Sequence, residues 1–135
     1  MGQQMKVAEE VAAAEFSRMC EAFRVDQNTA GLDAKELKSW NDTRQGIIGD
    51  ICRGALTIDT EGRPVYVPEM GKAVTFNRPT GATFMALETH KDKNISNTVA
   101  AMADMTGTNP GDFSRMFARD FKACSRIASL FLSEE

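Results

Sequence analysis

VTFNRPTGATFMAL, residues 74–87, divides the chain into two differently patterned parts. Val74-Thr75-Phe76 favours a short strand, and Arg78-Pro79 ends it, because the residue before a proline avoids helical geometry. Thr80 is a candidate helix cap, followed by the apolar residues Phe84, Met85 and Leu87. The stretch therefore predicts a strand, a proline-fixed corner and a helix start, which together set the angle between the two parts.

Two helices and a hairpin are expected before this stretch. Apolar residues recur at spacings of three and four over residues 6–24, which predicts a helix. Asp33 and Glu36 form a capping-box pattern that opens a second helix, and Gly54 is a candidate stop for it. Gly46 and Gly49 leave room for another backbone to lie close to that helix. The period then changes to two over residues 55–59 and 63–68, which indicates a hairpin turning at 60–62.

The hairpin and the strand at 74–77 predict a small antiparallel sheet. Pro64 and Pro68 cannot donate to a ladder, so we expect the second hairpin strand to lie at an edge or to pair on one side only. Alternation predicts the set of side chains that face the helices: Leu56, Ile58, Val65, Val67, Val74 and Phe76.

A set of short helices is expected after the corner. One begins near Thr80, the next ends at Gly107, a third opens at Asn109-Pro110, and Asp120 is a candidate cap for the last. The expected fold class is α+β and mostly helical, with two N-terminal helices, a small antiparallel sheet and a C-terminal bundle of three to four short helices. We expect one domain over 1–135, made of a helical part (1–54), the sheet (55–77) and a C-terminal helical part (80–133).

The overall charge limits the classes of partner that we expect, and the cysteines indicate the cellular compartment. A formal net charge of −3 gives no strong attraction to nucleic acid or to an anionic membrane surface, so we expect neither as a partner. No apolar stretch approaches the roughly 20 residues that span a bilayer. The three cysteines are widely spaced and odd in number, which favours a reducing compartment and a cytosolic location.

The residues that carry catalysis in other proteins are sparse here. His90 is the single histidine and lies in a charged break, while Cys20, Cys52 and Cys124 lie on apolar helix faces, where a cysteine acts as a small hydrophobe. Zinc spacing, the P-loop pattern and the dinucleotide glycine pattern are all missing from the sequence. We therefore expect no catalytic residues, no metal site, no cofactor and no enzyme activity.

Apolar residues in the C-terminal helices are the strongest candidate for a binding surface. Phenylalanine and methionine side chains gather there, and a small helical unit rich in them can present a patch to a partner. The candidate partner-binding residues, with two arginines at the rim, are Phe113, Met116, Phe117, Phe121, Phe131, Arg115 and Arg119. A basic face made of Arg115, Arg119, Lys122 and Arg126 leaves a small nucleic-acid-binding regulator as a less favoured alternative.

The layout of residues 73–132 resembles a known family, the tail assembly chaperones of long-tailed bacteriophages, small proteins encoded just before the tape measure. In that family the ending of helix, glycine, short helix, aspartate and helix recurs. The residues that carry the resemblance are Val74-Thr75-Phe76, the corner Arg78-Pro79-Thr80-Gly81, the helix Phe84-Met85-Ala86-Leu87, the helix end Met102 to Gly107, Asn109 to Phe117, Asp120, and Leu130-Phe131-Leu132.

The resemblance implies a non-enzymatic chaperone. Such a protein binds the long, helical, aggregation-prone tape measure protein and assists tail tube subunits in assembling around it. The implied partners are the phage tape measure protein and the tail tube protein, and the resemblance leaves a homo-oligomer open. The implied location is the host cytoplasm, with absence from the mature virion. A permanent structural component of a virion, such as a tail or connector subunit, is the alternative.

Overall fold

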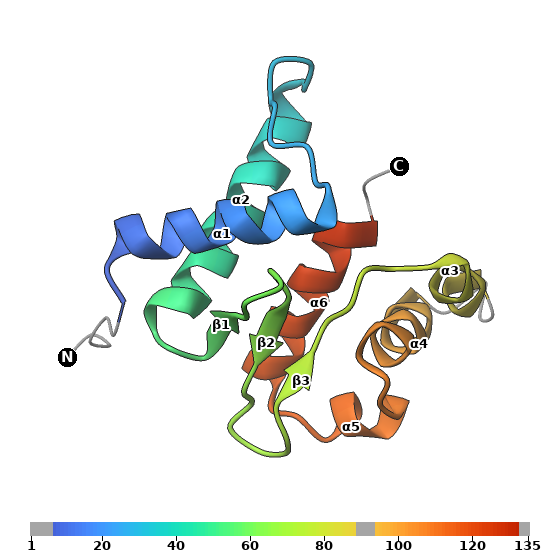
Figure 1. The fold of residues 1–135 in the computed structure, drawn as a ribbon. Coiled ribbons are helices and arrows are strands. Elements are labelled where there is room, and N and C mark those ends of the chain that lie inside the picture. Colours follow the sequence, from blue (N-terminus) through green and yellow to red (C-terminus); the bar gives the residue numbers. More distant parts are fainter. Residues whose placement is uncertain (1–6, 89–93, 133–135) are drawn as a thin grey trace.

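Helices make up most of the chain, and one small sheet packs against them (Figure 1). The computed structural model of the protein describes residues 7–88 and 94–132. The order of elements confirms the expected α+β, mostly helical class. In chain order they are α1 (Glu9–Phe23), α2 (Ala34–Cys52), β1 (Leu56–Ile58), β2 (Pro64–Tyr66), β3 (Val74–Thr75), α3 (Gly81–Glu88), α4 (Asn94–Thr106), α5 (Pro110–Ser114) and α6 (Ala118–Leu132).

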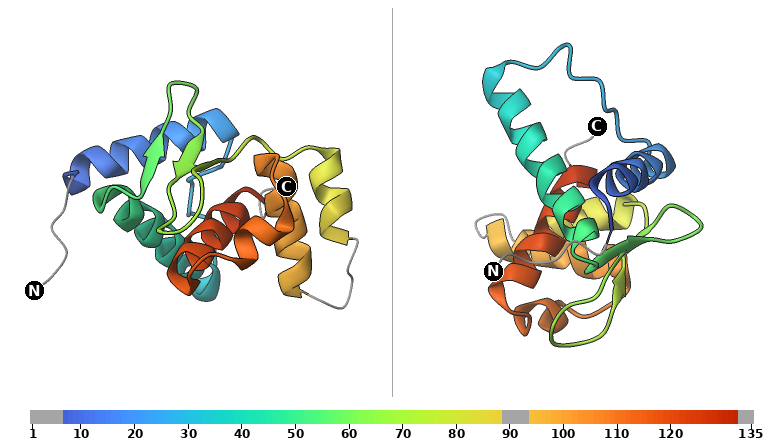
Figure 2. Two further views of the ribbon diagram at one scale, coloured as in Figure 1. Left: turned by 90° about the horizontal axis from the view of Figure 1, so that it is seen from below. Right: turned by 90° about the vertical axis from the view of Figure 1, so that its left-hand side faces the viewer.

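The last helix, α6, runs through the middle of the molecule (Figures 1 and 2). It packs against α2 from the N-terminal half and against α4 from the C-terminal half. α1 crosses α2, and α3 lies on the outer side of α4. One hydrophobic cluster joins α1, α2, the sheet, α4, α5 and α6, so both halves of the sequence share a single core.

The helix ends that local chemistry predicts are confirmed. The backbone N–H of Glu36 donates to Asp33 Oδ1 at 2.8 Å and that of Asp33 donates to Glu36 Oε1 at 3.0 Å, so the capping box opens α2. α2 ends at Cys52, and Gly54 follows with a φ of 82°. α4 ends at Thr106, and Gly107 has a φ of 66°. Pro110 begins α5, as its fixed φ favours.

The corner at residues 77–83 is fixed by polar contacts to α4. Asn77 donates twice to the carbonyl oxygen of Met105, from its backbone N–H and from its side-chain amide, both at 3.0 Å. The backbone N–H of Thr80 donates to Thr83 Oγ1 at 3.0 Å, and the Thr83 hydroxyl donates to the Asp104 carboxylate. Thr80 precedes α3 as expected, and the buried Thr83 side chain closes the first turn.

The strand β2 lies in the centre of the sheet, so its predicted edge position is wrong. The strand order is β1-β2-β3, with both pairs antiparallel. Pro64 is tolerated because it is the first residue of β2 and its missing N–H is not needed. The backbone N–H of Asp59 donates to the Arg63 carbonyl at 2.9 Å, and Phe76 donates to the Pro64 carbonyl at 2.9 Å.

The buried face of β2 carries Tyr66 and not the predicted Val65 and Val67. Tyr66 lies opposite Leu56 on one side and Val74 on the other, and residues directly opposite share a face. Leu56, Tyr66 and Val74 are buried, whereas Val65 is half-buried and Val67 is 52% exposed. A one-residue difference in hairpin register exchanges the two faces of a strand, which is the source of the error.

The hairpin turn docks closely on α1. Gly62 has a φ of 83°, and a Cβ at this position would lie 2.4 Å from the Ala22 Cβ, so only glycine fits without a shift. The Arg18 guanidinium donates to the carbonyl oxygens of Ile58 and Asp59 at 2.8 and 2.6 Å. These contacts fix the hairpin to the first helix and leave β2 facing α6.

Candidate functional site

Two of the seven predicted partner-binding residues belong to the core. Phe113 is fully buried, and Phe131 is 3% exposed. The Phe131 ring stacks on Phe23 of α1 with the centroids 4.1 Å apart. The expectation that these two rings belong to a partner-binding surface is corrected by this burial, because both side chains are part of the hydrophobic core.

The other five predicted residues lie at or near the surface around the start of α6. Phe117 is 50% exposed, while Met116 and Phe121 are half-buried against the core. The Arg115 side chain is exposed and pairs with Asp112 at 3.4 Å, within the neighbouring short helix α5. Arg119 is also exposed. The structure therefore brings one half-exposed aromatic ring and two arginines together at one end of α6.

The loop between β2 and β3 extends this surface, which sequence reasoning missed. The backbone N–H of Glu69 donates to Asp120 Oδ2 at 2.9 Å, and its carboxylate pairs with Arg119 at 3.6 Å. Met70, the next residue, is 55% exposed, and Figure 1 shows the loop beside the start of α6. We name Met70, Arg115, Phe117 and Arg119 the Phe117 surface. The sequence feature that indicates the loop's part of this surface is a methionine, Met70, in an otherwise polar turn.

A buried polar network holds this surface in place. Asp120 is 1% exposed and lies in the first turn of α6, so its predicted role as a helix cap is wrong. Its Oδ1 accepts a hydrogen bond from the Tyr66 hydroxyl, and its Oδ2 accepts the Glu69 backbone N–H. The Tyr66 hydroxyl also accepts a bond from Arg53 at 2.8 Å. Asp120 therefore binds the sheet, the β2–β3 loop and α6 together.

The network continues to Asp50 of α2 and Arg126 of α6. Asp50 Oδ1 accepts from Arg53 Nε at 3.0 Å, and its Oδ2 accepts from Arg126 Nη1 at 3.1 Å. A Cβ at Gly46 would lie 2.5 Å from Arg126 Nε, so this glycine gives the guanidinium its path across α2. The expectation that another backbone lies close at these two glycines is wrong: the neighbour at Gly46 is the Arg126 side chain, and Gly49 has nothing within 4 Å. We name Asp50, Arg53, Tyr66, Asp120 and Arg126 the Asp120 network.

Ion pairs with carboxylates reduce the positive charge of the predicted basic face. Of the four basic residues assigned to it, Arg126 is bound to Asp50, Arg119 to Glu69 and Arg115 to Asp112. Each of these guanidiniums lies beside a carboxylate that offsets its charge. The positive field that duplex recognition uses is therefore reduced on this side of α6.

The three thiols lie inside the protein. Cys20, Cys52 and Cys124 are buried, and none of the three forms a disulfide bond. Burial, and next the neighbouring carboxylate of Asp120, raise the pKa of the Cys124 thiol to about 12, so it stays protonated at neutral pH. Within the described ranges, no group of three or more His, Cys, Asp and Glu side chains is arranged to hold a metal ion. His90 lies outside the described residues.

Raising the pH from about 9 to about 10.5 is expected to lower the free energy of unfolding by about 2 kcal/mol. Burial raises the pKa values of both Cys124 and Tyr66 above their usual values of 9.0 and 10.0. The unfolded chain therefore releases both protons first, and stability that is complete below pH 9 is lost as the pH rises. Urea titrations across this range measure the slope.

The matched control for this pH dependence is Cys124→Ala. Removing the thiol is expected to remove about two-thirds of the decline, because the cysteine starts to ionise a full unit below the tyrosine in the unfolded chain. The same decline in Cys124→Ala as in the parent protein would show that Cys124 does not titrate in this way.

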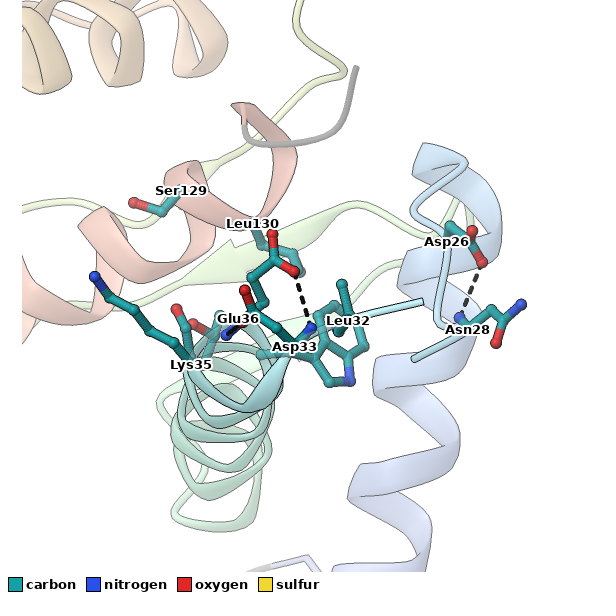
Figure 3. A pocket seen from close by; sticks show the side chains of 11 residues that line it. Asp26, Asn28, Leu32, Asp33, Lys35, Glu36, Ser129 and Leu130 are labelled. Carbon is teal, nitrogen blue, oxygen red and sulfur yellow. Dashed lines mark hydrogen bonds between the residues drawn. The ribbon is translucent and has the colours of Figure 1, made fainter. Parts of the chain in front are cut away.

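A groove lies at the opposite end of α6 from the Phe117 surface. It has a volume of about 780 Å³ and runs between the loop after α1, the first three turns of α2 and the end of α6 (Figure 3). Figure 3 shows Glu36, in the first turn of α2, beside Leu130 of α6, with Asp33 and Lys35 close to it at the start of the helix. Its lining residues are Asp26, Asn28, Leu32, Asp33, Lys35, Glu36, Ser39, Trp40, Thr43, Ser129 and Leu130.

Comparison with known proteins gave no match. Neither the protein-family models, nor the curated proteins, nor the solved structures searched with this chain matched it. Through residues 7–88 and 94–132, no helix is both long enough and apolar enough to cross a bilayer.

Proposed function

We propose that this chain is a non-enzymatic assembly chaperone of a phage tail, which binds a helical, aggregation-prone tape measure protein through the Phe117 surface. In this proposal the protein acts in the host cytoplasm while the tail is being assembled. It is released before the tail is complete, and it is therefore absent from the mature virion. The order of helix, Gly107, short helix and last helix, which carries the resemblance in the sequence, is the order of α4, α5 and α6.

The observation that carries the proposal is the half-exposed Phe117 ring. It is 50% exposed, and the exposed arginines 115 and 119 lie on either side of it in the sequence. Completing the burial of a phenylalanine of this exposure against a partner contributes about 2 kcal/mol. The flexible Met70 side chain nearby adapts to different apolar shapes, as a chaperone surface requires.

The Asp120 network supports the proposal by making the surface rigid. The sheet, the β2–β3 loop and the start of α6 come from distant parts of the sequence, and Asp120 of α6 accepts one hydrogen bond from Tyr66 of β2 and one from Glu69 of the loop. A surface whose parts are already held together loses less conformational entropy on binding. The loop and the helix start that carry this surface are therefore held together before a partner arrives, while the side chains on them stay adaptable.

Phe117→Asp is expected to abolish chaperone activity while the protein stays folded. Co-expression with a fragment of the tape measure protein encoded in the same genome measures the soluble fraction of that fragment. We expect the parent protein to raise this fraction at least fivefold, and Phe117→Asp to return it to the level without chaperone. An aspartate just before α6 also suits the positive end of the helix dipole, so the variant folds normally.

The matched control is Val11→Asp, which places the same charge at a valine of α1 that is 54% exposed. This variant is expected to keep the full solubilising effect. A tape measure fragment that is equally insoluble with and without the parent protein contradicts the proposal.

Mass spectrometry of mature particles separates the two candidate roles, because a permanent tail or connector subunit is present in them and a chaperone is not.

A further inference from the structure

The groove between α2 and α6 carries more negative than positive charge. Asp26, Asp33 and Glu36 contribute three carboxylates, and Lys35 contributes one ammonium, which gives a net formal charge of −2. The bonds of these carboxylates are to backbone N–H groups, those of Asn28, Glu36 and Asp33. Within the described part of the chain, none of the three forms an ion pair with a basic side chain.

The same groove has an apolar part. Leu32 is 36% exposed, Trp40 is half-buried, and Leu130 is buried. The Trp40 ring packs edge-to-face on the buried Phe16 ring with the centroids 6.1 Å apart, so the core side of the groove fixes its position. Apolar side chains inside a charged rim are the usual composition of a groove that receives the apolar face of a helix.

The geometry points to a second interaction surface: we propose that this groove binds a basic amphipathic segment of a partner protein, with apolar side chains on Leu32, Trp40 and Leu130 and with lysines or arginines facing Asp26, Asp33 and Glu36. Opposite charges around the rim favour such a segment and reject an acidic one. The surface is separate from the Phe117 surface, and the inference does not rest on the proposed chaperone function.

The shape of the groove favours a polypeptide over a small molecule. Eight of its eleven lining residues are exposed to solvent in the free protein, so the groove is open along its length. A small molecule in an open groove keeps much of its own surface in water, whereas small-molecule sites bury most of their ligand. A helix that lies along the groove covers its apolar part while its charged side chains reach the rim.

The chain contains its own reporter for this binding. Trp40 is the only tryptophan and lines the groove, so its fluorescence responds to a peptide without tryptophan. The probes are three synthetic 18-residue peptides with helical periodicity: leucine with lysine, leucine with glutamate, and serine with lysine. We expect the leucine–lysine peptide to shift the Trp40 emission to shorter wavelength with a saturable curve, and to bind at least tenfold tighter than either other peptide.

The decisive variant is the triple substitution Asp26→Asn, Asp33→Asn and Glu36→Gln. Each new amide keeps a carbonyl oxygen that accepts the same backbone N–H, and asparagine and glutamine suit a capping box, so the helix start is preserved. The matched control, Glu9→Gln, Glu10→Gln and Glu21→Gln, removes three exposed charges from α1. We expect the triple groove variant to lose at least tenfold in affinity and the control to change less than twofold.

Each other outcome overturns the proposal. If the serine–lysine peptide binds as tightly as the leucine–lysine peptide, charge alone attracts the probe. If the leucine–glutamate peptide binds as tightly, the carboxylates around the groove do not favour a basic segment over an acidic one. Equal loss in the control variant means that net charge acts without the groove. An unchanged Trp40 emission with the leucine–lysine peptide up to about 1 mM means that the groove does not bind such a segment.

Discussion

Asp120→Ala is expected to lower the free energy of unfolding by about 3 kcal/mol. The carboxylate is 1% exposed and accepts the Tyr66 hydroxyl and the Glu69 backbone N–H. Its removal leaves the buried Tyr66 hydroxyl and the partly buried Glu69 N–H without their acceptor, and each buried group left in this way costs about 1–3 kcal/mol. Urea denaturation followed by circular dichroism gives the value directly.

A double-mutant cycle separates the Tyr66–Asp120 bond from the other effects of these substitutions. Tyr66→Phe leaves the carboxylate without its hydroxyl partner, so it is expected to cost about 2 kcal/mol alone. The double variant is expected to cost at least 1 kcal/mol less than the sum of the two, because both partners are gone. Costs that simply add would mean that the two side chains do not stabilise one another.

Local sequence signals were sufficient for the helix ends. Asp33 and Glu36 satisfy one another within four residues, and Gly54 and Gly107 adopt a left-handed conformation that other residues avoid. These interactions need nothing from the rest of the chain. The fold class followed from them together with the change of period after residue 54, because helix and strand periodicities are properties of short segments.

The register of the sheet and the role of Asp120 were not predictable in this way. Alternation alone cannot distinguish a strand with Val65 inside from one with Tyr66 inside, since the two differ by one residue of hairpin register. Tyr66 is buried because its hydroxyl finds Asp120, which lies 54 positions later in the sequence. A carboxylate in a first helical turn looks like a helix-end charge until its distant partner is known.

The candidate site shows the same limit. Phenylalanines at helical spacing indicate an apolar face, but the spacing does not show which neighbours cover it. Phe113 and Phe131 are covered by the core, and Phe117 is left half-exposed. The loop that carries Met70 lies beside the start of α6 because Asp120 accepts the backbone N–H of Glu69. The surface therefore depends on a long-range contact, and the part of it that lies within one helix was the part that could be found.

Phe131→Ala is expected to lower the free energy of unfolding by about 3–5 kcal/mol. The ring is 3% exposed and stacks on Phe23 at 4.1 Å, so the substitution opens a cavity between α1 and α6. The matched control is Phe117→Ala, which changes the same residue type in the neighbourhood of the same helix, and it is expected to cost about 1–2 kcal/mol because only half of that side chain is buried. Urea denaturation of both variants measures the difference.

The comparison of these two variants also shows whether each phenylalanine ring stabilises the fold or is available for binding a partner. A phenylalanine that stabilises the folded chain by several kcal/mol is explained by packing, whereas one that contributes less and stays half-exposed calls for another reason. If Phe117→Ala costs as much as Phe131→Ala, the Phe117 ring packs in the core and the proposed surface loses its aromatic centre. If Phe131→Ala costs clearly more, the ring of Phe117 is free to be buried by a partner, and its substitution then changes binding without changing the fold.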